Sequence, residues 1–257
     1  MATWTAFPYD AAAYTHDTAT LKKLWAQLHA GDVEPWPQDD SVRAAWALFH
    51  AGRFQQASTA GLKAGGAGIT VANKAQCIHA NYLERSEKTR LALFLEVAAR
   101  AEAQQAAEPG NANAFYWQAY ALGRYSQGIS VARALSQGLG AKVKQALETT
   151  LRLAPTHADA HIALGSFHAE VIDKVGKLLG RTQGADTATG LKMFKDGLKL
   201  NPRSAIGRVE TANGLVMLEG DKRMAEAEAL YAEAAASTAL DAMERLDVEM
   251  AKAELAD

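Results

Sequence analysis

The chain has 257 residues, 49% of them apolar, and its 27 Lys and Arg residues stand against 29 Asp and Glu residues for a net charge of -2. This balance argues against a nucleic-acid-binding protein, which normally has a basic excess, and it gives no sign of membrane-surface binding. The single cysteine, Cys77, cannot form an internal disulfide. The residues after Met1 lack the basic and apolar regions typical of a signal peptide, and no apolar run approaches the roughly 18–20 residues that span a bilayer. We therefore expect a cytoplasmic protein without nucleic-acid or membrane partners.

Helical periodicity runs along nearly the whole chain, with glycine and proline between the segments. An irregular N-terminal arm precedes one short helix, and the rest of the pattern predicts about five helical hairpins and a last single helix. In chain order, the predicted helices cover 18–30, 41–51 with 54–64, 70–84 with 88–107, 112–136 with 141–153, 157–179 with 187–200, 204–219 with 224–236, and 240–255.

The last predicted helix is amphipathic. Leu240, Met243, Leu246 and Met250 lie on one apolar stripe, and charged residues cover the other side. A repeat protein needs such a helix, with one buried and one polar face, to cover its last repeat. The sequence thus predicts a single helical repeat domain over 1–257, with an N-terminal arm and helix over 1–39, repeats over 40–239 and a capping helix over 240–257.

Three prolines recur at a nearly fixed interval. Pro109, Pro155 and Pro202 are separated by 46 and 47 residues, and a small residue follows each of them three positions later. A fixed period of this size indicates stacked repeats. Because proline cannot continue a helix, these residues are expected to separate the second helix of one hairpin from the first helix of the next.

Two stretches carry a resemblance to a known repeat. His161-Ile-Ala-Leu-Gly165-Ser-Phe-His168 contains a Leu-Gly pair between bulky positions, and the segment 190–202 carries Phe194 and ends with Pro202. They resemble the first and second helices of the tetratricopeptide repeat (TPR), a helix–turn–helix unit of about 34 residues. Glycine lets two helices approach closely, and the aromatic ring is expected to fill the space beside it. Leu122-Gly123 repeats the Leu-Gly pair.

The resemblance implies an all-α, right-handed α-solenoid of about five TPR-like hairpins with elongated helices and a C-terminal capping helix. The period exceeds that of the TPR by about 12 residues, and we place the surplus between the paired helices, for example over 169–186. The chain looks most like uncharacterised bacterial TPR proteins and, more weakly, like eukaryotic regulators of microtubule dynamics. Neither relative implies a catalytic residue, so we expect no cofactor and no enzymatic activity.

The TPR resemblance also implies a binding groove, because positions beside the Leu-Gly pair line the concave side in that family. Tryptophan, tyrosine and arginine are typical anchors of binding surfaces. We therefore predict a protein-binding or peptide-binding scaffold whose partner is unknown, with self-association as a variant. For the aromatic members of the groove, packing between neighbouring helices is the alternative. The predicted groove residues are Trp117, Tyr120, Arg124 and Gln127 in the third hairpin, Asp159, Ser166 and Glu170 in the fourth, and Arg208 in the fifth.

Two other functions stay open at this level. One is a small-molecule binder in which the elongated helices enclose a cavity. The other is a metal-dependent enzyme built on His157, His161 and His168, with Asp159 or Glu170 as a further ligand. Two of these histidines occupy positions where the repeat places packing aromatics, so we expect packing and no metal. The single cysteine is expected to be a buried structural thiol.

Overall fold

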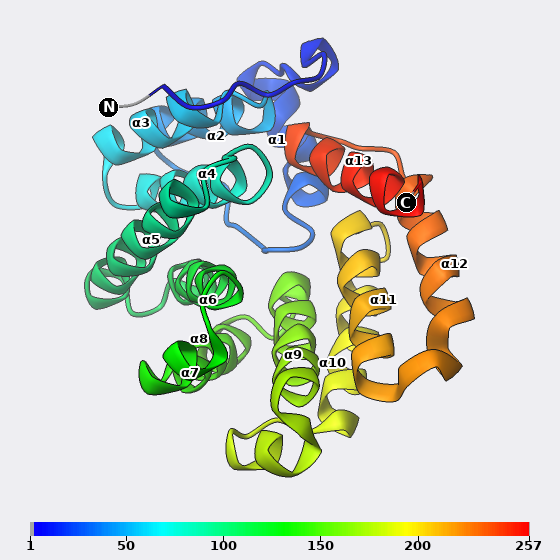
Figure 1. The fold of residues 1–257 in the computed structure, drawn as a ribbon. Coiled ribbons are helices and arrows are strands. Elements are labelled where there is room, and N and C mark those ends of the chain that lie inside the picture. The colour runs from blue at the N-terminus through cyan, green and yellow to red at the C-terminus, as the bar shows by residue number, and fades with distance from the viewer. Residues whose placement is uncertain (1–2, 257) are drawn as a thin grey trace. The chain divides into compact units, whose positions relative to one another are not determined.

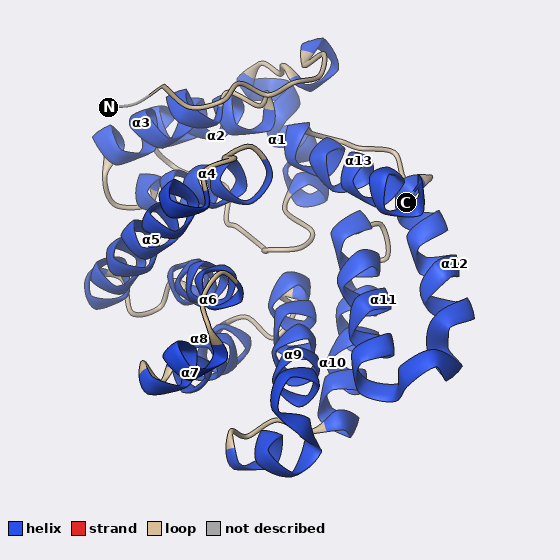
Figure 2. Cartoon of the chain, in the orientation of Figure 1, coloured by secondary structure: helices blue, strands red, loops and turns tan. Residues whose placement is uncertain are grey.

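The computed structural model describes residues 3–256, and this range consists of helices, turns and loops with no strand (Figure 2). The all-α prediction is therefore confirmed. Met1 and Ala2 of the predicted arm and Asp257 of the predicted capping segment lie outside the described residues.

The helices follow the predicted order, and the bounds of the third and tenth coincide with the prediction (Figure 1). They are α1 (Thr18–Leu28), α2 (Asp40–His50), α3 (Phe54–Ala64), α4 (Gly68–Tyr82), α5 (Glu87–Ala107), α6 (Ala112–Gln127), α7 (Val131–Ser136), α8 (Leu139–Leu153), α9 (Ala158–Thr182), α10 (Thr187–Leu200), α11 (Ala205–Glu219), α12 (Met224–Ala235) and α13 (Ala242–Ala256), with 3₁₀ turns η1 (Ala12–Tyr14) and η2 (Gly220–Arg223).

Glycines interrupt two of the longest predicted helices. The single helix predicted over 112–136 is wrong, because α6 and α7 are separate elements with Gly128 between them. A Cβ at Gly128 would lie 2.6 Å from the side chain of Leu91, so the missing side chain lets α5 approach here. The helix predicted over 157–179 extends further, as α9, but Gly176 interrupts it with φ 79° and ψ 161°. Only glycine adopts such a conformation without strain.

The periodic prolines mark the boundaries between helices, as predicted. Each lies two residues beyond the end of one helix and two residues before the N-cap of the next. The capping side chains belong to Asn111, His157 and Ser204. Each accepts a hydrogen bond from the backbone N–H of the residue three positions later, at 3.2, 3.1 and 2.9 Å respectively. Such caps satisfy donors that the first helical turn leaves without a partner. Proline and cap together thus stop one helix and start the next.

The chain divides into two compact units. Unit 1 contains the described residues up to His29 together with Glu34–Ser130 and Leu240–Met243, and unit 2 contains Ala30–Val33, Val131–Ala239 and the described residues from Glu244 onward. The division at 130/131 falls inside the predicted third hairpin, so α6 belongs to unit 1 and α8 to unit 2. All five tryptophans lie in unit 1. The prediction of one repeat domain over 1–257 stays a prediction.

Within each unit, consecutive helices pack on one another. In unit 1, α2 packs on α3 and α4, α3 on α4, α4 on α5, and α5 on α6. In unit 2, α9 packs on α8, α10 and α11, and α11 packs on α12. Among the described helices, none is long and apolar enough to cross a membrane.

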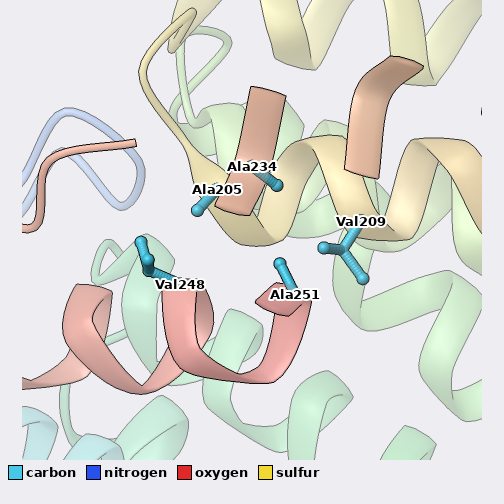
Figure 3. Packing of buried hydrophobic residues seen from close by; sticks show 5 residues of the cluster. All are labelled: Ala205, Val209, Ala234, Val248 and Ala251. Atoms are coloured by element: carbon cyan, nitrogen blue, oxygen red, sulfur yellow. The ribbon is translucent and has the colours of Figure 1, made fainter. Parts of the chain in front are cut away.

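The last helix covers the end of unit 2, as predicted for a capping helix. Leu246 and Val248 are buried, and Met250 packs against the cluster that contains Val248. Leu240, however, precedes the helix, and Asp247 is buried although the pattern placed it on the polar side. Figure 3 shows the small apolar cluster that joins α13 to α11 and α12: Ala205, Val209, Ala234, Val248 and Ala251.

Phe194 of α10 is enclosed by two glycines. A Cβ on Gly165 of α9 would lie 2.8 Å from Phe194 Cδ1, and a Cβ on Gly214 of α11 would overlap the same ring. Phe194 is only 1% exposed, so the ring fills the space that both glycines leave. This matches the packing predicted for the Leu-Gly motif. Gly123 differs, since no described neighbour lies within 4 Å of its Cβ position, and the close approach expected there is wrong.

These two glycine environments make a matched pair of tests. We expect Gly214→Ala to lower the free energy of unfolding by about 1–3 kcal/mol, because the enclosed Phe194 ring has no room to move aside. Gly123→Ala is expected to raise it by about 0.5–1 kcal/mol, since alanine favours the helix and meets nothing. Urea denaturation followed by far-UV circular dichroism measures both. Equal stabilities of the two variants would contradict the packing described above.

Candidate functional site

Four predicted groove residues form a row along α6. Trp117, Tyr120, Arg124 and Gln127 are spaced so that they share one face of the helix. The rings of Trp117 and Tyr120 lie 5.2 Å apart, and the guanidinium carbon of Arg124 lies 5.4 Å from the Tyr120 ring centroid. Arg124 Nη1 donates to Gln127 Oε1 at 3.2 Å. We call these four residues the α6 stripe.

Exposure rises along the α6 stripe. Trp117 is 3% exposed, Tyr120 and Arg124 are half-buried, and Gln127 is exposed. Trp117 therefore lies in the interior, which agrees with the alternative that the aromatic residues pack between neighbouring helices. The other three side chains reach the surface. The stripe thus runs from the interior of unit 1 to solvent.

A buried lysine lies at the inner end of the α6 stripe. Lys74 of α4 is 2% exposed, and its Nζ lies 5.9 Å from the ring centroid of Trp117, 5.6 Å from that of Trp46 and 5.2 Å from that of Phe49. Cation–π attraction of this kind is worth about 2 kcal/mol when the cation is desolvated. The three rings thus offset part of the cost of removing an ammonium group from water.

Polar side chains also join α4 to α5. Arg100 donates from Nε to Asn73 Oδ1 at 2.6 Å and from Nη2 to Gln76 Oε1 at 2.9 Å. Burial lowers the pKa of Arg100 from its usual value. Gln104 Nε2 donates to Thr70 Oγ1 at 3.0 Å. These bonds fix α4 against α5 and so fix the rotation that turns Lys74 toward the aromatic rings.

A second buried polar pair lies beside Trp46. His50 Nδ1 of α2 lies 2.7 Å from Asp241 Oδ2, and both side chains are buried. The His50 ring stacks on Trp46 with a centroid distance of 5.8 Å and an interplanar angle of 24°. Asp241 directly precedes α13, so this bond fixes a segment that is 191 residues away along the chain onto α2.

Two predicted groove residues of α9, Asp159 in its first turn and Glu170 in its middle, have different surroundings. The backbone N–H of Asp159 donates to the carbonyl of Gly31 at 3.0 Å, and the Asp159 carboxylate occupies the space where a side chain on Gly31 would lie. Glu170 Oε2 lies 3.5 Å from Lys174 Nζ. Both contacts are inside unit 2. They place Asp159 against the segment that precedes α2 and Glu170 at the surface of α9.

The remaining two predicted groove residues, Ser166 and Arg208, contact different helices. Ser166 Oγ donates to Glu210 Oε2 of α11 at 3.0 Å, whereas Arg208 Nε lies 2.9 Å from Glu233 Oε2 of α12. Glu210 was missed by the sequence reasoning. The repeat period could have indicated it, because adding the two proline intervals, 46 and 47 residues, to the predicted groove position Trp117 leads to position 210. Arg208 corresponds in the same register to position 161.

His157, His161 and His168 each have a separate hydrogen-bond partner. His157 Nδ1 accepts the N–H of Ala160 at 3.1 Å, and His168 Nδ1 accepts the N–H of Asp186 at 3.1 Å. His161 Nε2 lies 3.0 Å from the carbonyl oxygen of Pro155. Burial lowers the pKa of His168. In the described part of the chain, no three His, Cys, Asp or Glu side chains are grouped so that they could hold a metal ion.

Cys77 is buried in α4, and burial raises the pKa of its thiol far above its usual value. The thiol therefore stays protonated, which favours the structural role predicted for it over a nucleophilic one.

Comparisons with known proteins identify a fold. No family model matches the chain, and no curated protein matches it. Among solved structures it is similar to a thermophilic TPR protein of Thermus thermophilus, with a TM-score of 0.58 and 18% identity over 83% of this chain and 98% of that one. A human IFIT1 dimer with m7Gppp-AAAA also matches, more distantly, with a TM-score of 0.42 and 12% identity over 82% of this chain and 54% of that one. The first likeness shows that the chain has a TPR-type helical fold.

Proposed function

We propose that the protein is a non-enzymatic binding protein that captures a protein or peptide segment on the α6 stripe. The observation that carries this proposal is the fixed arrangement of the stripe. Arg124 lies over Tyr120 and bonds to Gln127, so these side chains are already ordered before a partner arrives. Binding then loses less side-chain entropy, and tyrosine with arginine provides the anchors that binding surfaces favour. The TPR-type fold supports a scaffold of this kind.

The proposed ligand is a protein or peptide segment because only the outer part of the α6 stripe is accessible. Tyr120, Arg124 and Gln127 reach the surface, whereas Lys74 and the rings around it are buried. A small molecule would have to displace side chains to reach that cluster, so an enclosed-cavity binder is less well supported. A metal-dependent enzyme on the His157–His168 segment is also less well supported, because each of the three histidines has a different hydrogen-bond partner.

We propose the four predicted groove residues of unit 2 as a separate contact surface. These residues are Asp159, Ser166, Glu170 and Arg208. The cytoplasmic location stays a prediction.

The proposal is tested by removing the exposed part of the stripe. Immobilised protein is used to capture partners from native lysate, the captured peptides are identified, and affinity for the purified partner is then measured. We expect Tyr120→Ala with Arg124→Ala to weaken that affinity at least about tenfold, because both anchors are lost. The melting temperature is expected to change little, since both side chains are half-buried at most.

Arg203→Ala provides the matched control, because it removes an exposed arginine from a turn in unit 2. It should bind the partner with unchanged affinity. Wild-type affinity of the Tyr120→Ala/Arg124→Ala variant, with a normal melting temperature, would show that the α6 stripe is not the binding surface.

A further inference from the structure

The last turns of α9 expose two adjacent leucines. Leu178 is 83% exposed, more than any other large apolar side chain of the described residues, and its neighbour Leu179 is 48% exposed. We call residues 177–182, which follow the non-helical Gly176, the α9 tip. In Figure 1 it is the lime-coloured turn where the chain reverses toward α10. Exposed apolar side chains gathered in one place mark binding surfaces more often than isolated ones do.

The α9 tip is held in place by hydrogen bonds. The carbonyl of Gly180 accepts the N–H groups of Gln183 and Ala185 at 3.0 and 2.9 Å, and His168 Nδ1 accepts the N–H of Asp186 at 3.1 Å. Gly180 and Ala185 are buried. The inner side of the tip is therefore packed and bonded, and the same fold turns the two leucines outward.

Cations flank the exposed leucines. Lys177 and Arg181 are exposed and lie four residues apart, on the same side of the helix as each other. The nearest acidic groups along the chain are Asp173, which is exposed before the break at Gly176, and Asp186. The Asp186 carboxylate accepts the N–H of Thr189 as the cap of α10, and Arg181 is close enough to contribute to the lowering of its pKa. Residues 177–182 thus carry two exposed leucines and two cations, and none of them is acidic.

We propose that the α9 tip docks on an anionic lipid surface. Leu178 and Leu179 enter the interface between headgroups and acyl chains, and Lys177 and Arg181 contact lipid phosphates. Apolar burial and attraction to anionic lipids act together in such contacts. A projecting turn suits a deformable bilayer, whereas docking on a protein would need a hollow of matching shape. The contact is peripheral, because the described helices include none that could cross a membrane.

This inference differs from the expectation of no membrane partner, which rested on the balanced charge of the whole chain. It is also independent of the proposed function, because the α6 stripe belongs to unit 1 and the tip to unit 2.

Vesicle co-sedimentation of the full chain tests the proposal. We expect binding to vesicles of phosphatidylcholine with phosphatidylserine and not to phosphatidylcholine alone, with loss of binding as salt is raised. Leu178→Ser with Leu179→Ser should lower the partition coefficient at least about fivefold, since less apolar surface is buried. Lys177→Glu with Arg181→Glu should lower it about tenfold or more.

Leu95→Ser is the control, because Leu95 is an exposed leucine of α5 in unit 1, with an exposure close to that of Leu179. It should bind as the wild type does, and circular dichroism of each variant confirms that it is folded. The proposal is overturned if the wild type fails to bind anionic vesicles at low salt, or if Leu95→Ser weakens binding as much as the tip variants do. It is equally overturned if the tip variants change only the sedimentation coefficient of the free protein, which would assign the tip to contact between copies of this chain.

Discussion

Trp117→Ala is expected to lower the free energy of unfolding by about 3–5 kcal/mol, the largest effect of any substitution on the α6 stripe. Trp117 is almost fully buried, and its ring lies 5.0 Å from that of Tyr116. Truncation would leave a cavity beside Lys74 and remove one of the rings that face its ammonium group. Trp117 therefore holds the inner end of the stripe, and its loss should weaken partner capture through stability alone.

Urea denaturation followed by far-UV circular dichroism measures this effect. Trp117→Phe, which keeps an aromatic ring, should retain more than half of the lost stability, and Tyr120→Ala should cost much less than Trp117→Ala because Tyr120 is half-buried. A Trp117→Ala variant as stable as the wild type would contradict the interior position. The comparison also shows why Tyr120 and Arg124 are the better pair for testing capture.

Asp241→Ala is expected to lower the free energy of unfolding by about 3 kcal/mol. The carboxylate lies 2.7 Å from His50 Nδ1 in a buried setting, and its removal leaves that ring nitrogen desolvated without the acceptor it has here. The bond also ties the residues before α13 to α2. Its loss should therefore increase the rate at which a protease cleaves the chain between α12 and α13.

Thermal unfolding and limited proteolysis check the two parts of this prediction. Asp221→Ala removes an exposed carboxylate from η2 and should change neither measurement. Asp241→Asn retains an acceptor for His50 and should fall between the wild type and Asp241→Ala. Wild-type stability of Asp241→Ala would mean that the buried pair contributes nothing to the fold.

The helices and their boundaries could be predicted because their signals are local. Proline stops α5, α8 and α10, and a capping side chain two residues beyond it starts the following helix. The enclosure of Phe194 could be predicted as well, since the repeat pattern pairs a glycine with an aromatic ring. The break after α6 was missed because a single glycine is tolerated in many helices.

The site could be predicted only in part. The pattern on α6 placed Trp117 and Arg124 on one face, but exposure along that face depends on which helices cover it. Lys74 was missed, because a lysine within a helix normally indicates a solvated face, whereas α4 is covered by α2 and α3 as well as by α5. Asp241 was missed because its partner, His50, is 191 residues away, and no local pattern connects the two.

The concentration of all five tryptophans in unit 1 has a practical consequence. Selectively excited tryptophan fluorescence of the unmodified protein therefore reports on unit 1, while circular dichroism reports the helices of both units. Transitions that coincide in the two signals would show that the units unfold together, and transitions that separate would give the stability of each unit. The chain thus carries its own optical label for one half of the fold.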